Sequence, residues 1–271
     1  MKNQYKRMEL IYGPGLLTLL RTKRVAVFGI GGVGGYAVEA LARSGVGTMD
    51  LFDHDTVDLT NLNRQIIALH STIGKYKVEV AKDRIRDIDP DITVNAHRTF
   101  YLPDSPESEH PDFREFDYVI DAVDTVTAKI SIITEAQKAG VPVISCMGCG
   151  NRVDPAKLVL CDIYETKNDP LARIMRRELR KRGVKSLKTV CSTEPAIRPL
   201  RYPDIDSDED SEPAREAAAE NDSIRSQRSK PRRRDVPGST AFVPPAAGLL
   251  AASAVIRDLT QFDPDDRVKG R

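Results

Sequence analysis

The sequence of 271 residues contains no tryptophan, only 6% aromatic residues, and no apolar run long enough to cross a membrane. A spanning helix needs roughly 20 apolar residues. The longest run, FVPPAAGLLAASAVI over residues 242–256, is shorter and contains two prolines, and we expect it to form a buried helix. The 17 glycines and 17 prolines are close to ordinary usage, which excludes collagen-like and wholly low-complexity chains.

Cysteine is also scarce. The chain has four, and its start, MKNQYKRMEL, lacks the apolar stretch of a secretory signal. We therefore expect a cytoplasmic protein with free thiols rather than a disulfide framework. Cys146 and Cys149 have C-x-x-C spacing, but Cys161 and Cys191 are far apart in the sequence, so a structural zinc site is not expected. Cys146 ends an apolar run and is predicted to be a small buried residue.

Charge of one sign is not in excess, because 41 Lys and Arg balance 40 Asp and Glu to a net charge of +1. The charges are nonetheless segregated: residues 204–212 (DIDSDEDSE) are acidic and residues 228–234 (RSKPRRR) are basic. Dense blocks of like charge bury too little apolar surface to order the backbone. We predict a disordered insertion over residues 204–237, within one domain made of residues 1–203 and 238–271.

Short apolar strands and amphipathic helices alternate between residues 20 and 150. Strands are expected at residues 24–29, 47–53, 92–97, 116–121 and 141–145, and helices at residues 33–44, 76–86 and 128–139. A strand, a glycine turn, a helix and a second strand form a βαβ unit, which joins parallel strands by a right-handed crossover. The sequence therefore predicts an α/β fold: a Rossmann-like, doubly wound, mostly parallel sheet with flanking helices.

A glycine-rich loop, GIGGVG over residues 29–34, follows the first predicted strand. It satisfies G-x-G-x-x-G between a strand and a helix, where glycines let a phosphate approach backbone amides at the helix N-terminus. Asp53 ends the next strand, where a carboxylate accepts hydrogen bonds from ribose hydroxyls. This context predicts an adenine-nucleotide site, and the loop alone does not separate NAD from ATP.

Polar and basic side chains gather after Asp53 and favour a triphosphate. Arg64 and Lys77 can clamp β- and γ-phosphates and neutralise charge on departing pyrophosphate, and the alternative is a solvated helix face. Asp124 ends another strand, where open sheets place their ligands and where a carboxylate suits Mg²⁺. The candidate nucleotide-binding side chains of this segment are Asp53, Asp55, Asn61, Asn63, Arg64 and Lys77.

Four segments together resemble a known family. GIGGVGGYAVEALARSGVG, LFDHDTVDLTNLNRQ, GKYK and YVIDAVDT are similar to the ThiF/MoeB-type adenylating domain that ubiquitin-activating enzymes share with bacterial activators of sulfur-carrier proteins. GCGNRVDP, DIYET, DPLARIMRRELRKRG and GSTAFVPPAAGLLAAS further resemble the branch of dehydratases that act on threonylcarbamoyladenosine in tRNA. The resemblance covers residues 5–200 and 238–260.

The resemblance implies roles for individual residues. This sequence departs from the family pattern at Gly35, where a serine is frequent, and at Cys149, where the dehydratases usually carry alanine or glycine. The resemblance assigns the phosphate loop to Gly29, Gly31, Gly32 and Gly34, and ribose binding to Asp53. It assigns binding of the triphosphate to Arg64 and Lys77, and of Mg²⁺ to Asp124. It also implies a homodimer in which Arg7 contacts the phosphates bound by the partner subunit.

The same resemblance implies a reaction. ATP would adenylate the carboxylate of threonylcarbamoyladenosine beside the anticodon, and the neighbouring ureido group would attack the activated carbon and expel AMP. Because the second step is intramolecular, no side-chain nucleophile is needed, and no cysteine stands out as a thioester acceptor. A monovalent cation, and a partner of sulfur-relay or cysteine desulfurase type, are compatible with this resemblance.

Three other functions stay open at this stage. An activator of a ubiquitin-like sulfur-carrier protein would usually carry a second C-x-x-C pair, which is absent here. An NAD-dependent oxidoreductase would leave Arg64, Lys77 and Asp124 without a role. A nucleotide-binding scaffold without chemistry fits the loop equally well.

Residues 173–188 (RIMRRELRKRGVKSLK) contain eight basic residues and one acid. On a helix they would present a cationic face, with Ile174, Met175 and Leu179 turned inward. Such a face suits a tRNA substrate, since each phosphate neutralised adds salt-dependent affinity. The alternative is a solvated amphipathic helix. The candidate RNA-binding residues are Arg173, Arg176, Arg177, Arg180 and Lys181.

Overall fold

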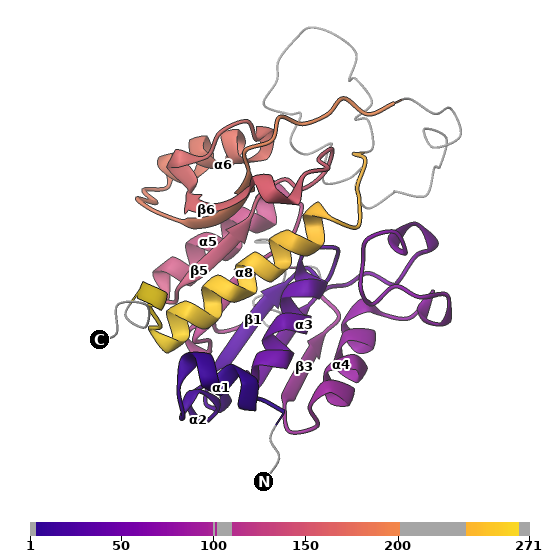
Figure 1. The fold of residues 1–271 in the computed structure, drawn as a ribbon. Coiled ribbons are helices and arrows are strands. Elements are labelled where there is room, and N and C mark those ends of the chain that lie inside the picture. Colours follow the sequence, from indigo (N-terminus) through magenta and orange to yellow (C-terminus); the bar gives the residue numbers. More distant parts are fainter. Residues whose placement is uncertain (1–3, 100, 102–109, 201–236, 266–271) are drawn as a thin grey trace, which may run out of the picture.

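The computed structural model describes residues 4–99, 101, 110–200 and 237–265, and within them seven strands form one sheet (Figure 1). In these residues the strand order is β3-β2-β1-β4-β5-β7-β6, with β6 alone running antiparallel to its neighbour. After β3 the chain returns to the other side of β1, so β1 and β4 flank a switch point where open sheets bind ligands. The strands are β1 (Arg24–Phe28), β2 (Thr48–Phe52), β3 (Thr93–His97), β4 (Tyr118–Asp121), β5 (Val143–Cys146), β6 (Leu158–Asp162) and β7 (Lys188–Ser192).

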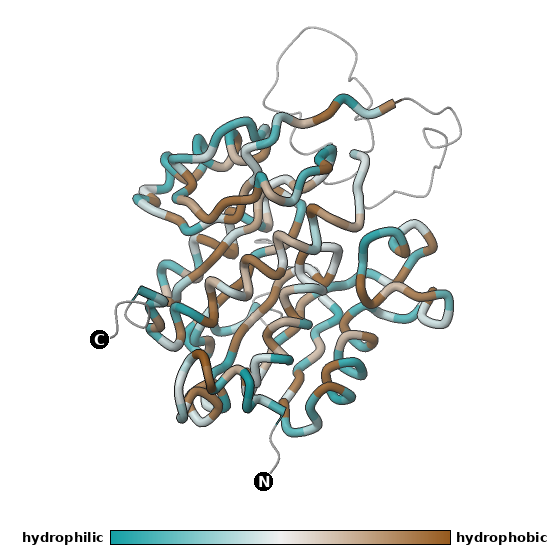
Figure 2. Tube along the Cα trace, in the orientation of Figure 1, coloured by the Kyte–Doolittle hydropathy of each residue, from teal (hydrophilic) through white to brown (hydrophobic). Residues whose placement is uncertain are grey.

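Helices cover both faces of the sheet, and hydrophobic residues are concentrated along the central strands (Figure 2). One face is covered by α2 (Leu16–Arg21), α3 (Gly34–Ser44), α4 (Lys77–Ile88) and α8 (Val243–Thr260), with α1 (Lys6–Tyr12) beside α2. The other is covered by α5 (Val126–Lys138) and α6 (Pro170–Lys181). In β1, Val25 and Val27 join the first core and Ala26 and Phe28 the second, so both faces of this strand are buried.

The loops carry short 3-10 turns: η1 (Leu59–Asn61), η2 (His70–Thr72), η4 (Phe113–Glu115), η5 (Pro155–Lys157) and η6 (Ile163–Glu165). The strands and helices predicted between residues 20 and 150 are confirmed, with ends that shift by at most two residues. α3 ends at Gly45, whose left-handed backbone (φ 85°) suits glycine. The predicted insertion lies outside the described residues except for Pro237, and the predicted domain's residues 1–3 and 266–271 also lie outside them.

The apolar run near the C-terminus forms helix α8, as predicted. Pro244 and Pro245 stand in its first turn, where a missing N–H is tolerated. A Cβ at Gly248 would come within 2.1 Å of the Val33 carbonyl oxygen, so only glycine allows α8 to approach the start of α3 this closely. Among the described helices, none is long and apolar enough to cross a membrane.

The basic helix α6 differs from the prediction in two ways. It ends at Lys181 rather than continuing toward residue 188, since Gly183 turns the chain with φ 75°. Met175 and Leu179 are buried as expected, but the inward orientation predicted for Ile174 is wrong, because that side chain is 39% exposed. The buried stripe runs through Ala172, Met175 and Leu179, and at 100° per residue Ile174 lies about 130° from the centre of that stripe.

The cysteines are free in this fold, and Cys146 is buried at the end of β5 as predicted. Cys161 and Cys191, distant in sequence, become neighbours because β6 and β7 pair, which leaves their Sγ atoms 3.4 Å apart. In the described part of the chain, the cluster of Asp53, His54 and Asp55 is the one group of three or more side chains with metal-compatible spacing.

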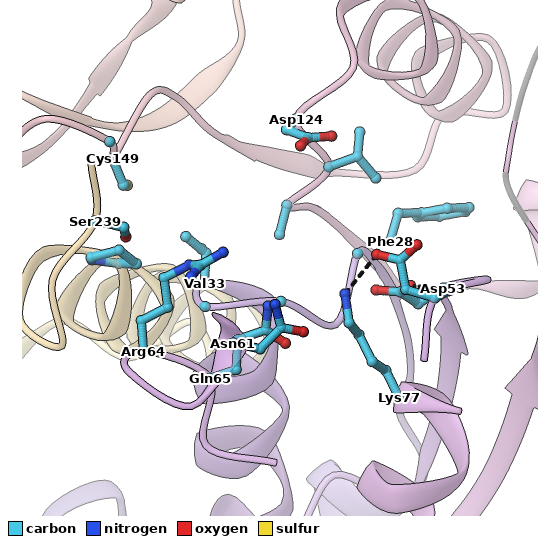
Figure 3. A pocket seen from close by; sticks show the side chains of 18 of the residues that line it. Phe28, Val33, Asp53, Asn61, Arg64, Gln65, Lys77, Asp124, Cys149 and Ser239 are labelled. Carbon is cyan, nitrogen blue, oxygen red and sulfur yellow. Dashed lines mark hydrogen bonds and ion pairs between the residues drawn. The ribbon is translucent and has the colours of Figure 1, made fainter. Parts of the chain in front are cut away.

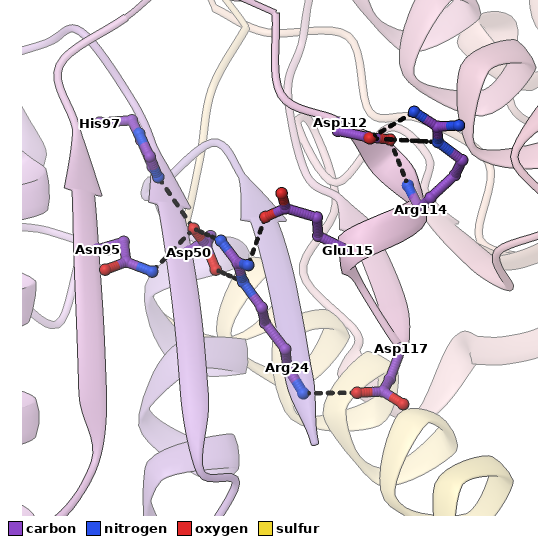
Figure 4. A network of polar contacts seen from close by, with 8 residues as sticks. All are labelled: Arg24, Asp50, Asn95, His97, Asp112, Arg114, Glu115 and Asp117. Carbon is purple, nitrogen blue, oxygen red and sulfur yellow. Dashed lines mark hydrogen bonds and ion pairs between the residues drawn. The ribbon is translucent and has the colours of Figure 1, made fainter. Parts of the chain in front are cut away.

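A polar network joins the neighbouring strands β1, β2 and β3 (Figure 4). Asp50 of β2 is buried and accepts hydrogen bonds from Arg24 (2.8 and 3.0 Å), Asn95 (3.1 Å) and the His97 ring (3.0 Å). Burial alone would raise the pKa of Asp50, but these hydrogen bonds outweigh it and lower the pKa to about 2. The carboxylate is therefore ionised at neutral pH and ties three strands together.

Candidate active site

A pocket of about 390 Å³ opens at the carboxyl ends of β1, β2 and β4, at the switch point of the sheet (Figure 3). Its volume is in the range of small-ligand sites. Asp53 and Phe28 lie at one end, Cys149 and Ser239 at the other, and Asp124 and Arg64 between them. Of the residues predicted from the sequence, the pocket gathers Gly29, Gly31, Gly32, Asp53, Asp55, Asn61, Arg64, Lys77 and Asp124.

The glycine loop forms the floor of this pocket and leads into α3. Gly29 has a φ of +87°, which side chains rarely adopt, and a Cβ at Gly34 would lie 1.8 Å from the Gly29 carbonyl oxygen. The loop therefore closes tightly, and Gly31, Gly32 and Val33 line the pocket immediately before α3 begins. The N-terminus of a helix with free amides is an anion site, and phosphate is the anion that such loops accept.

Asp53 fixes the start of the loop from the end of β2. Its Oδ2 accepts the Ile30 N–H at 2.7 Å and its Oδ1 accepts the Asp55 N–H at 2.9 Å. Burial raises the pKa of Asp53, and the nearby Lys77 opposes that rise. Beside this carboxylate the rings of Phe28 and Phe52 stack with centroids 4.4 Å apart, which provides an apolar wall for a ring system at this end.

Two cations stand at different places in the pocket. Lys77 is buried, and its Nζ pairs with Asp55 at 2.6 Å near the Asp53 end. Arg64 is held by neutral acceptors only, the carbonyl oxygen of Thr60 and Oδ1 of Asn63, both at 2.9 Å. Arg64 forms no ion pair within the described residues, so its charge is available to an anionic ligand.

Asp124 projects into the pocket from the loop after β4. Its carboxylate is exposed and accepts one long hydrogen bond, 3.4 Å from the Thr125 hydroxyl. Below it, Lys129 is fully buried and donates to the Val123 carbonyl (2.9 Å) while pairing with Asp121 (3.0 Å). Asp121 also accepts the Ser145 hydroxyl at 2.5 Å. This buried group fixes the loop that carries Asp124.

Some predicted site residues lie elsewhere. Gly34 lies below the loop, where it packs against Gly29. Asn63 is outside the lining, and its amide donates to the Ser239 carbonyl at 3.2 Å. Arg7 is exposed on α1 and is not among the residues that line the pocket. Helix α1 lies near the amino ends of the strands (Figure 1). The basic residues of α6 line a separate hollow.

The pocket also contains residues that the sequence did not single out. Gln65 is buried, and its Oε1 has no hydrogen-bond partner within the described residues, so a polar ligand beside the glycine loop would satisfy it. Its position next to Arg64 was the available signal. Ser239 reaches the pocket from the far side of the predicted insertion, and nothing local in the sequence indicates that contact.

A glycine loop at a helix N-terminus, an acidic residue after β2, two cations and a free carboxylate at the switch point define the class of α/β proteins that bind nucleoside triphosphates. The chain belongs to the ThiF family, whose model matches residues 1–270. An NAD-dependent oxidoreductase would leave Arg64 and Asp124 of this pocket without a role.

Curated relatives agree with this membership. The chain is 41% identical over 273 residues to a tRNA threonylcarbamoyladenosine dehydratase of Bacillus subtilis, covering 100% of both chains. It is 36% identical over 197 residues to the protein of that name in Escherichia coli, covering 70% of this chain and 73% of the relative. The E. coli enzyme in complex with AMP superposes with a TM-score of 0.76 at 28% identity, covering 95% and 94% of the two chains. Its complex with ATP gives a TM-score of 0.75 at 29% identity, with the same coverage.

Proposed function

We propose that this protein is an ATP-dependent dehydratase that cyclises threonylcarbamoyladenosine in tRNA. The observation that carries the proposal is the pocket itself, in which the glycine loop, Arg64 and Asp124 surround one space. The full-length similarity to proteins named for this activity supports the substrate. The ubiquitin-like carrier alternative has less support, because a fungal adenylyltransferase and sulfurtransferase aligns with only 48% of this chain.

The residues divide the work along the pocket. Asp53 holds the ribose beside the aromatic wall, and the amides of the loop and α3 hold the phosphates. Arg64 stabilises the negative charge that accumulates on pyrophosphate as the substrate carboxylate attacks the α-phosphorus. Lys77, once released from Asp55 by the incoming phosphates, adds to this stabilisation. The acyl-adenylate then loses AMP when the neighbouring ureido group closes the ring.

The donor set at Asp124 fits a Mg²⁺ ion. The Asp124 carboxylate is exposed, faces the phosphate loop and has no cationic partner within the described residues, and hard oxygen ligands are what Mg²⁺ prefers. A bound Mg²⁺ would neutralise phosphate charge. A monovalent cation remains an expectation without assigned residues.

One assay tests the reaction. Incubation of the protein with ATP, Mg²⁺ and tRNA bearing threonylcarbamoyladenosine is expected to release pyrophosphate and to reduce the mass of the modified nucleoside by one water. Nucleoside mass spectrometry measures the product. Equal pyrophosphate release with unmodified tRNA would contradict the proposed substrate, and release with a sulfur-carrier protein alone would support the alternative.

The tRNA is proposed to approach along α6. This helix begins beside the pocket, because its N-cap residue Asp169 accepts the N–H of Gly148 at 3.1 Å and the N–H of Ala172 at 3.0 Å. The five basic residues of the face are not equivalent. Arg176 bonds Thr166, Arg177 and Lys181 pair with Glu178, and Arg180 lies over the Tyr164 ring. Arg173 is exposed and has no polar partner within the described residues.

Replacing Arg173 with alanine is expected to weaken tRNA binding and to reduce the slope of log affinity against log salt by about 1, since one phosphate contact is lost. Filter binding or fluorescence titration at several salt concentrations measures the slope. Arg114→Ala is the matched control, because Arg114 is also exposed but pairs with Asp112 on η4. An unchanged slope in Arg173→Ala would contradict the proposal that α6 contacts the tRNA.

A homodimer is part of the proposal, with Arg7 reaching the phosphates bound by its partner. Leu10 and Ile11, which are adjacent on the same short helix, are 79% and 59% exposed and would be covered by an interface that includes α1. We also propose a cytoplasmic location, where modified tRNA is available.

A further inference from the structure

The wall of the pocket at the end far from Asp53 is made by two segments that are distant in sequence. Cys149 and Gly150 come from the loop after β5, and Pro237, Gly238 and Ser239 come from the chain that enters α8. Neither segment contributes a charged side chain to the pocket. Arg64 is the charged side chain beside this end, so the end suits an acyl group that adjoins the phosphates held by Arg64 rather than the phosphates themselves.

Asn151 joins the two segments by a pair of short hydrogen bonds. Its N–H donates to the Gly238 carbonyl at 2.7 Å, and its side-chain Oδ1 accepts the Gly238 N–H at 2.7 Å. Its own carbonyl accepts the Ile197 N–H at 2.8 Å. One residue thus fixes the chain on both sides of residues 198–237 at a single place beside the pocket.

The backbone of Asn151 is suited to this task. It has a φ of 58°, in the left-handed region that asparagine tolerates better than most residues. That conformation directs the N–H and the side chain toward the same neighbour. A Cβ added at Gly150 would come within 3.1 Å of Pro237, which indicates how closely the two segments pack.

The fixed segment connects to the catalytic side of the pocket. The Ser239 carbonyl accepts the Asn63 amide at 3.2 Å, and Asn63 Oδ1 accepts Arg64 at 2.9 Å. In Figure 3, Ser239 lies near both Cys149 and Arg64. A shift of residues 237–239 would therefore alter the end of the pocket beside Arg64 while leaving Asp53 and the glycine loop in place.

We propose that Asn151 is a positioning residue for the acyl substrate, which holds residues 237–239 as the wall against which the carboxylate-bearing group is placed. This role rests on the proposed function, because the acyl group is that of threonylcarbamoyladenosine. It assigns no chemical step to Asn151, which acts through Gly238 and Ser239.

The test compares two asparagines. Asn151→Gly keeps the left-handed backbone and removes only the side-chain acceptor, and Asn151→Asp keeps the acceptor. Asn168→Gly is the matched control, because Asn168 has the same φ of 58° and donates from its side chain to the Thr193 carbonyl at 3.0 Å, outside the pocket.

Asn151→Gly is expected to raise the KM for modified tRNA about 10-fold, as the loss of one hydrogen bond allows, while the KM for ATP stays within about twofold. Asn151→Asp restores the KM, and Asn168→Gly leaves both constants unchanged. A parallel rise in the KM for ATP, or no rise in the KM for tRNA, overturns the proposal.

A second measurement is independent of the substrate. Because Cys149 is buried at the same end of the pocket as residues 237–239, its alkylation by N-ethylmaleimide, located by peptide fragmentation, is expected to accelerate in Asn151→Gly and not in Asn168→Gly. Unchanged alkylation overturns the positioning role whatever the substrate. If alkylation is faster in Asn151→Gly but the wild-type protein does not convert modified tRNA, the positioning role of Asn151 is supported and the proposed function is refuted.

Discussion

Replacing Asp124 with alanine is expected to reduce AMP and pyrophosphate formation by about 10³-fold, the effect of removing one electrostatic contributor to a charged transition state. The carboxylate is exposed and has one long hydrogen bond, so its removal should leave the fold intact. Radiolabelled ATP and thin-layer separation of AMP measure the rate. Thermal unfolding of the same preparation checks the fold.

The control for this variant is Asp91→Ala, which removes an exposed aspartate from the turn before β3, outside the pocket. Its rate should match that of the wild type. Adding Mg²⁺ in excess is not expected to rescue Asp124→Ala, because the ligand itself is missing. Near-normal AMP formation in Asp124→Ala would exclude the proposed metal ligand.

Replacing Lys129 with methionine is expected to destabilise the protein by about 3–5 kcal/mol, since it leaves the buried charge of Asp121 without a partner. Lys129 and Asp121 are both fully buried, and their charged atoms are 3.0 Å apart. The Val123 carbonyl would also lose its donor, one residue before Asp124. Urea unfolding measures the free energy, and AMP formation at low temperature measures the activity.

The double variant Lys129→Met, Asp121→Asn separates charge from packing. Removing both charges should recover much of the stability, because a buried neutral pair avoids the unpaired charge. Activity should recover less, since the Val123 carbonyl still lacks its donor. If Lys129→Met alone unfolds at wild-type urea concentration, the pair does not stabilise the loop.

The sequence was sufficient for the half of the fold that is built from local patterns. Apolar runs ending at Gly29 and Asp53 marked β1 and β2, and the strand, glycine turn and helix order fixed parallel pairing. The switch point is known only from the structure, where the chain returns to the other side of β1 after β3, and both Arg64 and Asp124 line the pocket there. Their grouping was predictable because parallel strands present their carboxyl ends at one edge.

Contacts between distant segments were less accessible to this reasoning. Cys161 and Cys191 become neighbours only through the pairing of β6 with β7, and neither strand was identified. Ile174 was expected to be buried because apolar residues on an amphipathic helix usually are. The buried stripe of α6 is narrow, however, and Ile174 lies outside it on the exposed part of the helix. The role of Gln65 as a candidate ligand-binding residue could not be predicted either, because it depends on its buried Oε1 lacking a hydrogen-bond partner within the described residues.

The approach of α8 to the start of α3 bears on how the protein is made. A ribosome releases the N-terminal half first, so the glycine loop emerges well before Gly248, the residue that packs on Val33. Until α8 arrives, the apolar face of α3 lacks its cover and Pro244 is missing from the pocket. The pocket that the glycine loop opens is therefore complete only after α8 and the residues that lead into it have been made.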